Sequence, residues 1–141
     1  MSCNSLRTNF ARLHKQGYKL TEPRRHIIEK LHAQRRAFTA PELYEQVADH
    51  GVSLATVYRT LALLVELGLA EAATWDGDEH RYIACAPQDH HHHVVCTGCG
   101  RVADITECLI EPFEELVRQQ TDFTIESHTV EFQGYCGACR Q

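Results

Sequence analysis

Apolar side chains repeat at helical spacing in three segments of the first half of the chain. The first segment begins at the capping residue Thr21 and runs to about Gln34, and the second follows a capping box at residues 39–42. The third begins after Ser53, a preferred capping residue, and ends at Gly68. Its apolar stripe is broad, so the pattern predicts three helices that share one core.

Two short segments after the third helix alternate between apolar and polar residues. They cover residues 69–75 and 80–84 and flank Asp76-Gly77-Asp78, a turn sequence typical of a β-hairpin. Three helices followed by a hairpin predict a winged helix-turn-helix domain, which we place at residues 1–84.

The rest of the chain has the pattern of a smaller α/β unit. Pro87 marks a hinge, placed at residues 85–90, and the second unit then spans residues 91–141. We expect three strands and one helix, over residues 92–95, 101–105, 124–133 and 107–120. The predicted fold class is α+β, with an N-terminal winged helix-turn-helix domain and a small C-terminal α/β dimerisation domain. Units this small often need a metal or a second subunit for stability.

Composition and cysteine spacing predict the compartment. No apolar run approaches the roughly 20 residues that a membrane-spanning helix needs, and no apolar signal segment follows the charged residues 1–12. Four of the seven cysteines form two Cys-x-x-Cys pairs, which favours a reducing environment over disulfides. We therefore expect a cytoplasmic protein with no membrane partner.

The net charge of −5 is distributed unevenly along the chain. Residues 1–75 hold 10 Lys and Arg against 7 Asp and Glu, or +3, whereas residues 76–141 hold 4 against 12, or −8. A basic first half suits a polyanionic partner, and an acidic second half rich in His and Cys suits cations. The alternative is that the asymmetry has no particular function.

The two Cys-x-x-Cys pairs predict a structural zinc site. Each pair sits in a turn that contains glycine, and two pairs together supply the four thiolates of a tetrahedral site. Their ligands would be Cys96, Cys99, Cys136 and Cys139. The alternatives are a redox dithiol or two unrelated turns, but redox chemistry would need only one pair at a helix start.

Four consecutive histidines, His90 to His93, precede the first cysteine pair. Side chains alternate along a strand, so His91 and His93 would face one side and His90 and His92 the other. One metal held by Glu71, Cys85, His91 and His93 would connect the two units across Pro87. The alternative for any single histidine is a surface or packed residue.

The third helix of a winged helix enters the major groove of DNA with the polar residues near its start. In this chain those residues are Ser53, Thr56, Tyr58 and Arg59. Further phosphate contacts are expected from nearby basic residues, namely Lys15, Lys19, Arg24 and Arg25. The alternative is a solvated basic face with Tyr58 packed in the core.

Three stretches of the chain together resemble the ferric uptake regulator family of bacterial metal-sensing repressors. They are Thr56-Val57-Tyr58-Arg59-Thr60-Leu61, residues 90–99 and residues 134–139. The resemblance covers nearly the whole chain. It implies a homodimer that binds double-stranded DNA at AT-rich palindromic operators when metal is loaded, with no enzymatic activity and no small-molecule substrate. It also implies that Tyr58 and Arg59 touch DNA and that the paired cysteines hold structural Zn²⁺.

Within this family the chain looks most like the zinc uptake regulators, which repress zinc-uptake genes. Iron and peroxide sensors carry a histidine where this chain has Arg35-Arg36-Ala37-Phe38, and Cys85 stands where zinc sensors carry a thiolate. Soft sulfur favours Zn²⁺ over Fe²⁺. The resemblance implies sensing ligands at Glu71, Cys85, His91 and His93, and a further site at His90, His92, Glu111 and His128.

Three alternatives remain open at the level of the sequence. The first is a member of the same family that responds to iron, manganese or peroxide. The second is a zinc hydrolase, although the chain has no His-Glu-x-x-His helix. The third is a zinc store, which would bind metal without binding an operator.

Overall fold

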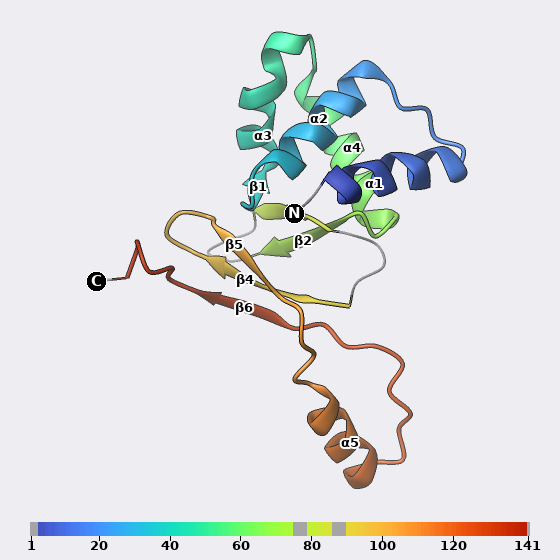
Figure 1. Cartoon of the computed structure of the whole chain (residues 1–141), viewed down its shortest axis with the longest axis vertical. Helices are drawn as coiled ribbons and strands as arrows, with labels where there is room; N and C mark the ends of the chain where they lie inside the picture. The colour runs from blue at the N-terminus through green and yellow to red at the C-terminus, as the bar shows by residue number, and fades with distance from the viewer. Residues whose placement is uncertain (1–2, 75–78, 86–89, 141) are drawn as a thin grey trace.

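The computed structural model describes residues 3–74, 79–85 and 90–140. Figure 1 shows helices α1–α4 gathered at one end of the molecule, α5 at the other end and two small sheets between them. The fold is α+β, as predicted. The predicted turn at residues 76–78 and the predicted hinge at Pro87 lie outside the described residues. No helix among those described is long and apolar enough to cross a membrane.

The N-terminal unit contains helices and one antiparallel sheet. Its helices are α1 (Cys3–Lys15), α2 (Glu22–Ala33), α3 (Ala40–Val47), the 3-10 helix η1 (Ala48–His50) and α4 (Leu54–Glu66). Its strands are β1 (Phe38–Thr39), β2 (Ala70–Thr74) and β3 (His80–Ala84), in the order β1-β3-β2. The three predicted helices and the two wing strands are confirmed.

Side chains at the helix starts satisfy free backbone amides, as the sequence predicted. The Thr39 hydroxyl accepts a hydrogen bond from the Glu42 amide at 3.2 Å, and the Glu42 carboxylate accepts one from the Thr39 amide at 3.0 Å. The Ser53 hydroxyl accepts from the Thr56 amide at 3.1 Å. These caps fix the starts of α3 and α4, and so fix which residues of α4 face outward.

Helix α1 was not predicted. Leu6, Phe10 and Leu13 recur at helical spacing in it, and Leu13 is fully buried while the other two pack against the core. The core of the unit also includes the largest buried side chains of α2, α3 and α4, namely Ile27, Ile28, Leu31, Leu43, Val47, Val57, Leu61 and Leu64. The short apolar pattern of α1 was hidden by the charged residues around it.

The C-terminal unit has a three-stranded sheet and one helix. Its elements are β4 (His92–Cys96), β5 (Val102–Ile105), α5 (Glu111–Gln120) and β6 (Glu131–Gly134). Strand β4 is central, antiparallel to β5 and parallel to β6. The parallel pairing places Cys96 opposite Gly134, so the turns after β4 and β6 meet at one edge of the sheet.

Two predicted boundaries in this unit are wrong. The helix predicted from residue 107 begins at Glu111, because Pro112 is accepted in a first turn but would clash with a preceding carbonyl in a helix interior. The strand predicted from residue 124 begins at Glu131. Within the described chain, residues 124–130 pair with no other strand, and alternation without a partner does not make a strand.

The two units meet along a short backbone contact. The segment between α2 and β1 runs beside the turn before β5, where the Ala37 amide donates to the Gly100 carbonyl at 2.9 Å and the Val102 amide donates to the Arg35 carbonyl at 3.0 Å. Ala37, Ile83, Val95 and Val102 form a small buried cluster beneath this contact. The end of β3 is therefore held close to β4.

Candidate metal centres and nucleic-acid interface

The described residues bring thiols and imidazoles together in three clusters. Within each cluster the ligand atoms all lie within 4.8 Å of one another. The four-cysteine cluster contains Cys96, Cys99, Cys136 and Cys139, the junction cluster contains Cys85, His91 and His93, and the distal cluster contains His90, His92, Cys108 and His128. The predicted alternation is confirmed, because His91 and His93 join one cluster and His90 and His92 join another.

The four-cysteine cluster forms where the turns after β4 and β6 meet. The Sγ atoms of Cys99 and Cys136 are 3.8 Å apart, and the Cys136 amide donates to the Cys96 sulfur at 3.3 Å. Hydrogen bonds from the backbone amides of Cys136 and Cys99 lower the pKa of Cys96 to about 6. The amides of Ala138 and Cys139 also lower the pKa of Cys136, whereas hydrogen bonds with the other three thiols raise the pKa of Cys139 to about 12. Four converging sulfurs, two of which ionise readily, fit a structural zinc site.

Close packing leaves little room for a side chain at one position of this cluster. A Cβ atom added to Gly98 would lie 3.1 Å from both the Cβ and the Sγ of Cys139. Glycine between the two cysteines of the first pair therefore allows the second pair to approach. This explains in structural terms the glycine that the sequence places in the turn.

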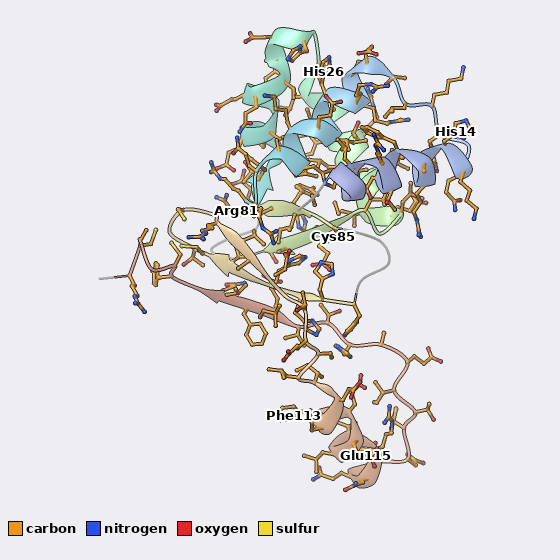
Figure 2. The ribbon with its side chains drawn as sticks, in the orientation of Figure 1. His14, His26, Arg81, Cys85, Phe113 and Glu115 are labelled. Atoms are coloured by element: carbon orange, nitrogen blue, oxygen red, sulfur yellow. The ribbon has the colours of Figure 1, made fainter. Side chains whose placement is uncertain are left out.

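The junction cluster connects the two units. Cys85 follows β3 and is 4% exposed, and its sulfur lies 3.4 Å from Nε2 of His93 on β4. Figure 2 shows Cys85 where the two sheets face each other. His91 and His93 have ring centroids 4.6 Å apart. The thiol directly follows the wing strand β3, whereas His93 lies on β4 and His91 directly precedes that strand. One ion held here would therefore contact both units.

Two carboxylates flank His93. An oxygen of Glu71 on β2 lies 3.4 Å from Nε2, on the side of Cys85, although Glu71 is not part of the tight group of three. Asp104 on β5 lies 3.1 Å from Nδ1 and also pairs with the guanidinium of Arg35. When Nδ1–H of His93 donates a hydrogen bond to the Asp104 carboxylate, Nε2 carries the lone pair, which points toward the thiol.

The environment of Cys85 keeps its thiol protonated while no ion is bound. Burial raises the pKa of Cys85 well above its usual value, and the carboxylates of Glu71 and Asp104 raise it further. A cation that binds the sulfur must therefore displace a proton. Binding at this cluster consequently weakens as the pH falls.

The distal cluster lies on the opposite face of β4. His128 comes from the segment between α5 and β6, and its Nε2 is 3.5 Å from the Cys108 sulfur. Its ring centroid is 4.8 Å from that of His90 and 5.3 Å from that of His92. Glu111 is not in the cluster, and Cys108 contributes the fourth ligand atom instead.

Sequence reasoning missed Cys108 and also Glu114. The Glu114 carboxylate, from α5, lies 2.6 Å from Nδ1 of His128 and orients that ring. The available signal was Pro112, which delays the helix start and leaves Cys108 in the non-helical segment between β5 and α5. The remaining ligands predicted for this site, His90, His92 and His128, do come together.

An open cavity of about 480 Å³ joins the junction and distal clusters. Its lining includes Glu71, Cys85, His128 and all four consecutive histidines. Solvent therefore reaches both clusters, which gives dissolved ions a route to each.

The outward face of α4 presents the residues predicted to contact DNA. Tyr58 is 48% exposed and Arg59 is also exposed, so Tyr58 is not packed in the core. The Arg59 guanidinium donates to the Thr56 hydroxyl at 3.2 Å, and that hydroxyl lies 2.8 Å from the Ser53 hydroxyl. Polar groups are thus held in order along the first turns of the helix.

The other basic residues that were predicted to contact phosphates differ in their exposure and in their contacts. Lys15, at the end of α1, is exposed. The Arg24 guanidinium donates to the Lys19 carbonyl, and that of Arg25 lies 5.6 Å from the centre of the Phe10 ring. The arginines of α2 therefore already have contacts within the unit, whereas Lys15 extends into solvent.

Comparison with known proteins gives consistent matches. The ferric uptake regulator family matches residues 15–133. The chain is 36% identical to the ferric uptake regulation protein of Bacillus subtilis over 90% of this chain and 89% of that one, and 26% identical to the peroxide-responsive repressor PerR of Staphylococcus epidermidis over 98% and 92%. The crystal structure of the Vibrio cholerae ferric uptake regulator aligns with a TM-score of 0.69 and 30% identity, over 91% of this chain and 99% of that one.

Proposed function

Because the chain belongs to the ferric uptake regulator family of metal-responsive regulators, we propose that it is a zinc-responsive transcriptional repressor rather than an enzyme. The names of the relatives point to iron and peroxide, so the zinc assignment rests on the residues of this chain. The observation that carries it is the buried Cys85 thiol beside His93, in a cluster that both units share. A thiolate with two imidazoles suits Zn²⁺ better than Fe²⁺ or Mn²⁺.

The four-cysteine cluster fits a permanent zinc ion and the junction cluster fits a responsive one. Four thiolates close a structural site completely. At the junction, Cys85, His91 and His93 would hold the ion, with Glu71 next to them as the fourth candidate ligand. A Zn²⁺ ion held there would act as a Lewis acid that accepts lone pairs from ligands of both units at once.

Metal binding at the junction would favour one relative placement of the two units. A ligand shifts a conformational equilibrium only by its differential affinity for the two states. Cys85 and His93 belong to different units, so their close approach exists only in the joined arrangement. Zinc that bridges them would stabilise the arrangement in which α4 presents Tyr58 and Arg59 to DNA.

We further propose that the protein acts as a homodimer on a double-stranded, palindromic operator. Helix α5 and its flanks expose large apolar side chains in the single chain, namely Leu109, Phe113, Leu116, Val117 and Phe123. Figure 2 shows Phe113 on α5, well away from the helical unit. A second copy that covers this face would place two α4 helices on one duplex. Thr56, Tyr58 and Arg59 would then contact bases and phosphates, with Lys15 as an added phosphate contact.

A second candidate is a response to Fe²⁺ or Mn²⁺. Glu71 and Asp104 both flank His93, and carboxylate oxygens suit these harder ions. The relatives named for ferric uptake and for peroxide response are consistent with this possibility. The pairing of Asp104 with Arg35 argues against it, because a guanidinium already occupies part of that carboxylate.

Titration of DNA binding by individual metals tests the proposal. The purified chain, with its four-cysteine site loaded, is first used to select a duplex from a random pool, and its affinity for that duplex is then measured with added Zn²⁺, Mn²⁺ or Fe²⁺. We expect Zn²⁺ to raise the affinity most. Cys85→Ser should abolish this response, whereas Cys85→Asp should transfer it to Mn²⁺ or Fe²⁺. If Cys85→Ser still responds to Zn²⁺ like the unchanged chain, the proposal is wrong.

A further inference from the structure

The distal cluster holds four potential ligand atoms that suit a closed site. Three are imidazole nitrogens, from His90, His92 and His128, and the fourth is the Cys108 sulfur. Three imidazoles and one thiolate provide a complete tetrahedral set for Zn²⁺. By contrast, the family resemblance implied a carboxylate, that of Glu111, in the fourth position.

One imidazole of this cluster lacks a partner that its burial would require. His92 is 6% exposed, and its Nε2 atom makes no hydrogen bond among the described residues. A buried polar atom without a partner costs about 1–3 kcal/mol. An ion bound by Nε2 together with the neighbouring ring of His128 would remove this cost.

The outer contacts of the cluster are also those of a metal site. The His128 ring has Cys108 at its Nε2, 3.5 Å away, and the Glu114 carboxylate at its Nδ1, 2.6 Å away. A carboxylate that accepts a hydrogen bond from Nδ1–H of a histidine leaves the Nε2 lone pair free to bind a metal and fixes the orientation of the ring. Glu114 therefore occupies the usual position of an orienting carboxylate rather than that of a ligand.

We propose that Cys108, and not Glu111, completes a third zinc site with His90, His92 and His128, and that this ion fastens the α5 arm to the β5-β4-β6 sheet. The α5 arm is defined as residues 106–130. Cys108 precedes α5 and His128 follows it, while His92 lies on β4. One ion would therefore hold both flanks of the arm against one strand.

The position of α5 in the fold gives this ion a role that ions in the four-cysteine and junction clusters cannot have. Figure 1 shows α5 extending away from both sheets, connected to them only by its two flanking segments. In the single chain no residue of the arm is buried. Loss of the ion would release both flanks at once, and with them the apolar face of α5. The third site would thus control the surface proposed for dimerisation, separately from the response at Cys85.

Cobalt spectroscopy distinguishes the two possible fourth ligands. A thiolate bound to Co²⁺ produces a charge-transfer band in the near ultraviolet, whereas a carboxylate does not. The experiment uses the full chain with zinc in the four-cysteine site and the substitution Cys85→Ser, so that the junction thiol cannot contribute. In this background Co²⁺ should produce the band, Glu111→Gln should retain it, and Cys108→Ser should abolish it.

Further variants and a second measurement distinguish the loss of one ligand from misfolding of the chain. Cys108→Asp should still bind one Co²⁺ per chain at this site but without the band. Glu114→Gln should keep the band and weaken binding by about 10- to 100-fold, as losses of orienting partners do. Cys108→Ser should also shift sedimentation toward the monomer at limiting zinc. Retention of the band in Cys108→Ser, or its loss in Glu111→Gln, would overturn the inference.

The inference rests on the proposal that the chain binds zinc, but the experiments distinguish a failure of the third site from a failure of the proposed function. If Cys85→Ser leaves the zinc response of DNA binding intact while Cys108→Ser removes the cobalt band, the proposed function is wrong and the third site stands. If the DNA response depends on Cys85 and the band does not depend on Cys108, the function stands and the third site is wrong.

Discussion

The two units of this chain are stabilised in different ways. The N-terminal unit buries a continuous apolar core from four helices, and Leu13, Ile27, Leu43 and Leu61 are each fully buried in it. In the C-terminal unit, residues 103–140 are described without a gap and none of them is buried. Burial of apolar surface is the main source of folding free energy. The first unit therefore supplies its own stability, whereas we expect the second to depend on the proposed zinc ions and on the proposed second subunit.

The largest expected effect follows from this difference. Removal of zinc by a strong chelator under reducing conditions should unfold the sheet around Cys96 and Cys136, because structural zinc sites in small peptides are worth about 10–16 kcal/mol. The helices α1–α4 should remain folded. Hydrogen exchange, followed segment by segment, measures both effects in one sample. If β4 and β6 stay equally protected after complete zinc removal, the C-terminal unit does not depend on bound zinc for its stability.

A charge on the α5 arm should separate the subunits. Phe113 is 63% exposed in the single chain, and Phe113→Glu would place an unpaired carboxylate in the proposed dimer interface. Lost apolar contact and a buried charge together cost roughly 3–5 kcal/mol, so we expect dimer affinity to fall by more than about 100-fold. Analytical ultracentrifugation measures this change. Phe113→Leu is the matched control and should remain dimeric.

A cavity in the core should affect mainly the N-terminal unit. Leu61→Ala removes a fully buried side chain from α4 and should lower the free energy of unfolding by about 2–5 kcal/mol. Val65→Ala, on the same helix but 37% exposed, should cost less than about 1 kcal/mol. Urea denaturation followed by the helical signal compares the two. Similar losses in both variants would show that α4 does not pack as described.

The N-terminal core should also be sensitive to acid. Burial lowers the pKa of His32 from 6.5 to about 4, and the Asn9 amide donates to its Nε2 at 2.6 Å. Between pH 6.5 and about pH 4, His32 is protonated in the unfolded chain but not in the folded chain. The free energy of unfolding therefore falls as the pH is lowered from about 7. At pH 5 the loss should be about 2 kcal/mol.

Urea denaturation at pH 7 and pH 5 measures this dependence. His32→Gln should reduce the difference between the two pH values, and His14→Gln, at an exposed position of α1, should leave it unchanged. An equal pH dependence in the His32→Gln variant and the unchanged chain would rule out this histidine as its source.

The smallest expected effect concerns the contact between the units. Arg35 pairs with Asp104, which in turn holds Nδ1 of His93. Partly exposed ion pairs contribute up to about 1 kcal/mol, so Arg35→Gln should reduce the gain in DNA affinity caused by zinc by about two- to fivefold. Arg36→Gln is the control, because Arg36 pairs with Glu42 inside the N-terminal unit. Fluorescence anisotropy with the selected duplex, with and without zinc, gives the gain for each variant.

Most of the N-terminal fold could be predicted from local signals. Thr21, Thr39 and Ser53 each cap the helix that the sequence assigned to them. Such signals are readable because a cap and its amide lie within three residues of each other. Helix α1 lacks a comparable signal and was missed, although Leu13 is completely buried.

The C-terminal unit was less predictable, since its pairings join distant residues. The strand predicted at residues 124–133 starts earlier than β6, because alternation does not reveal where the partner strand ends. The fourth ligand of the distal cluster was placed at Glu111, whereas the chain brings Cys108 to His128 across 20 residues. Family resemblance supplied the location of that site but not the side chain that reaches it.

The sequence by itself determined the starts of α2, α3 and α4, the two cysteine pairs and the alternation of His90 to His93, because each depends on spacing within a short segment. Only the tertiary structure decided that the Cys108 thiol joins His90, His92 and His128. It also shows why the thiol predicted for the junction reaches its imidazoles. Cys85 meets His93 because the backbone contact between Arg35 and Val102 holds the wing against β4. That approach depends on packing between segments far apart in the chain, and no local pattern records it.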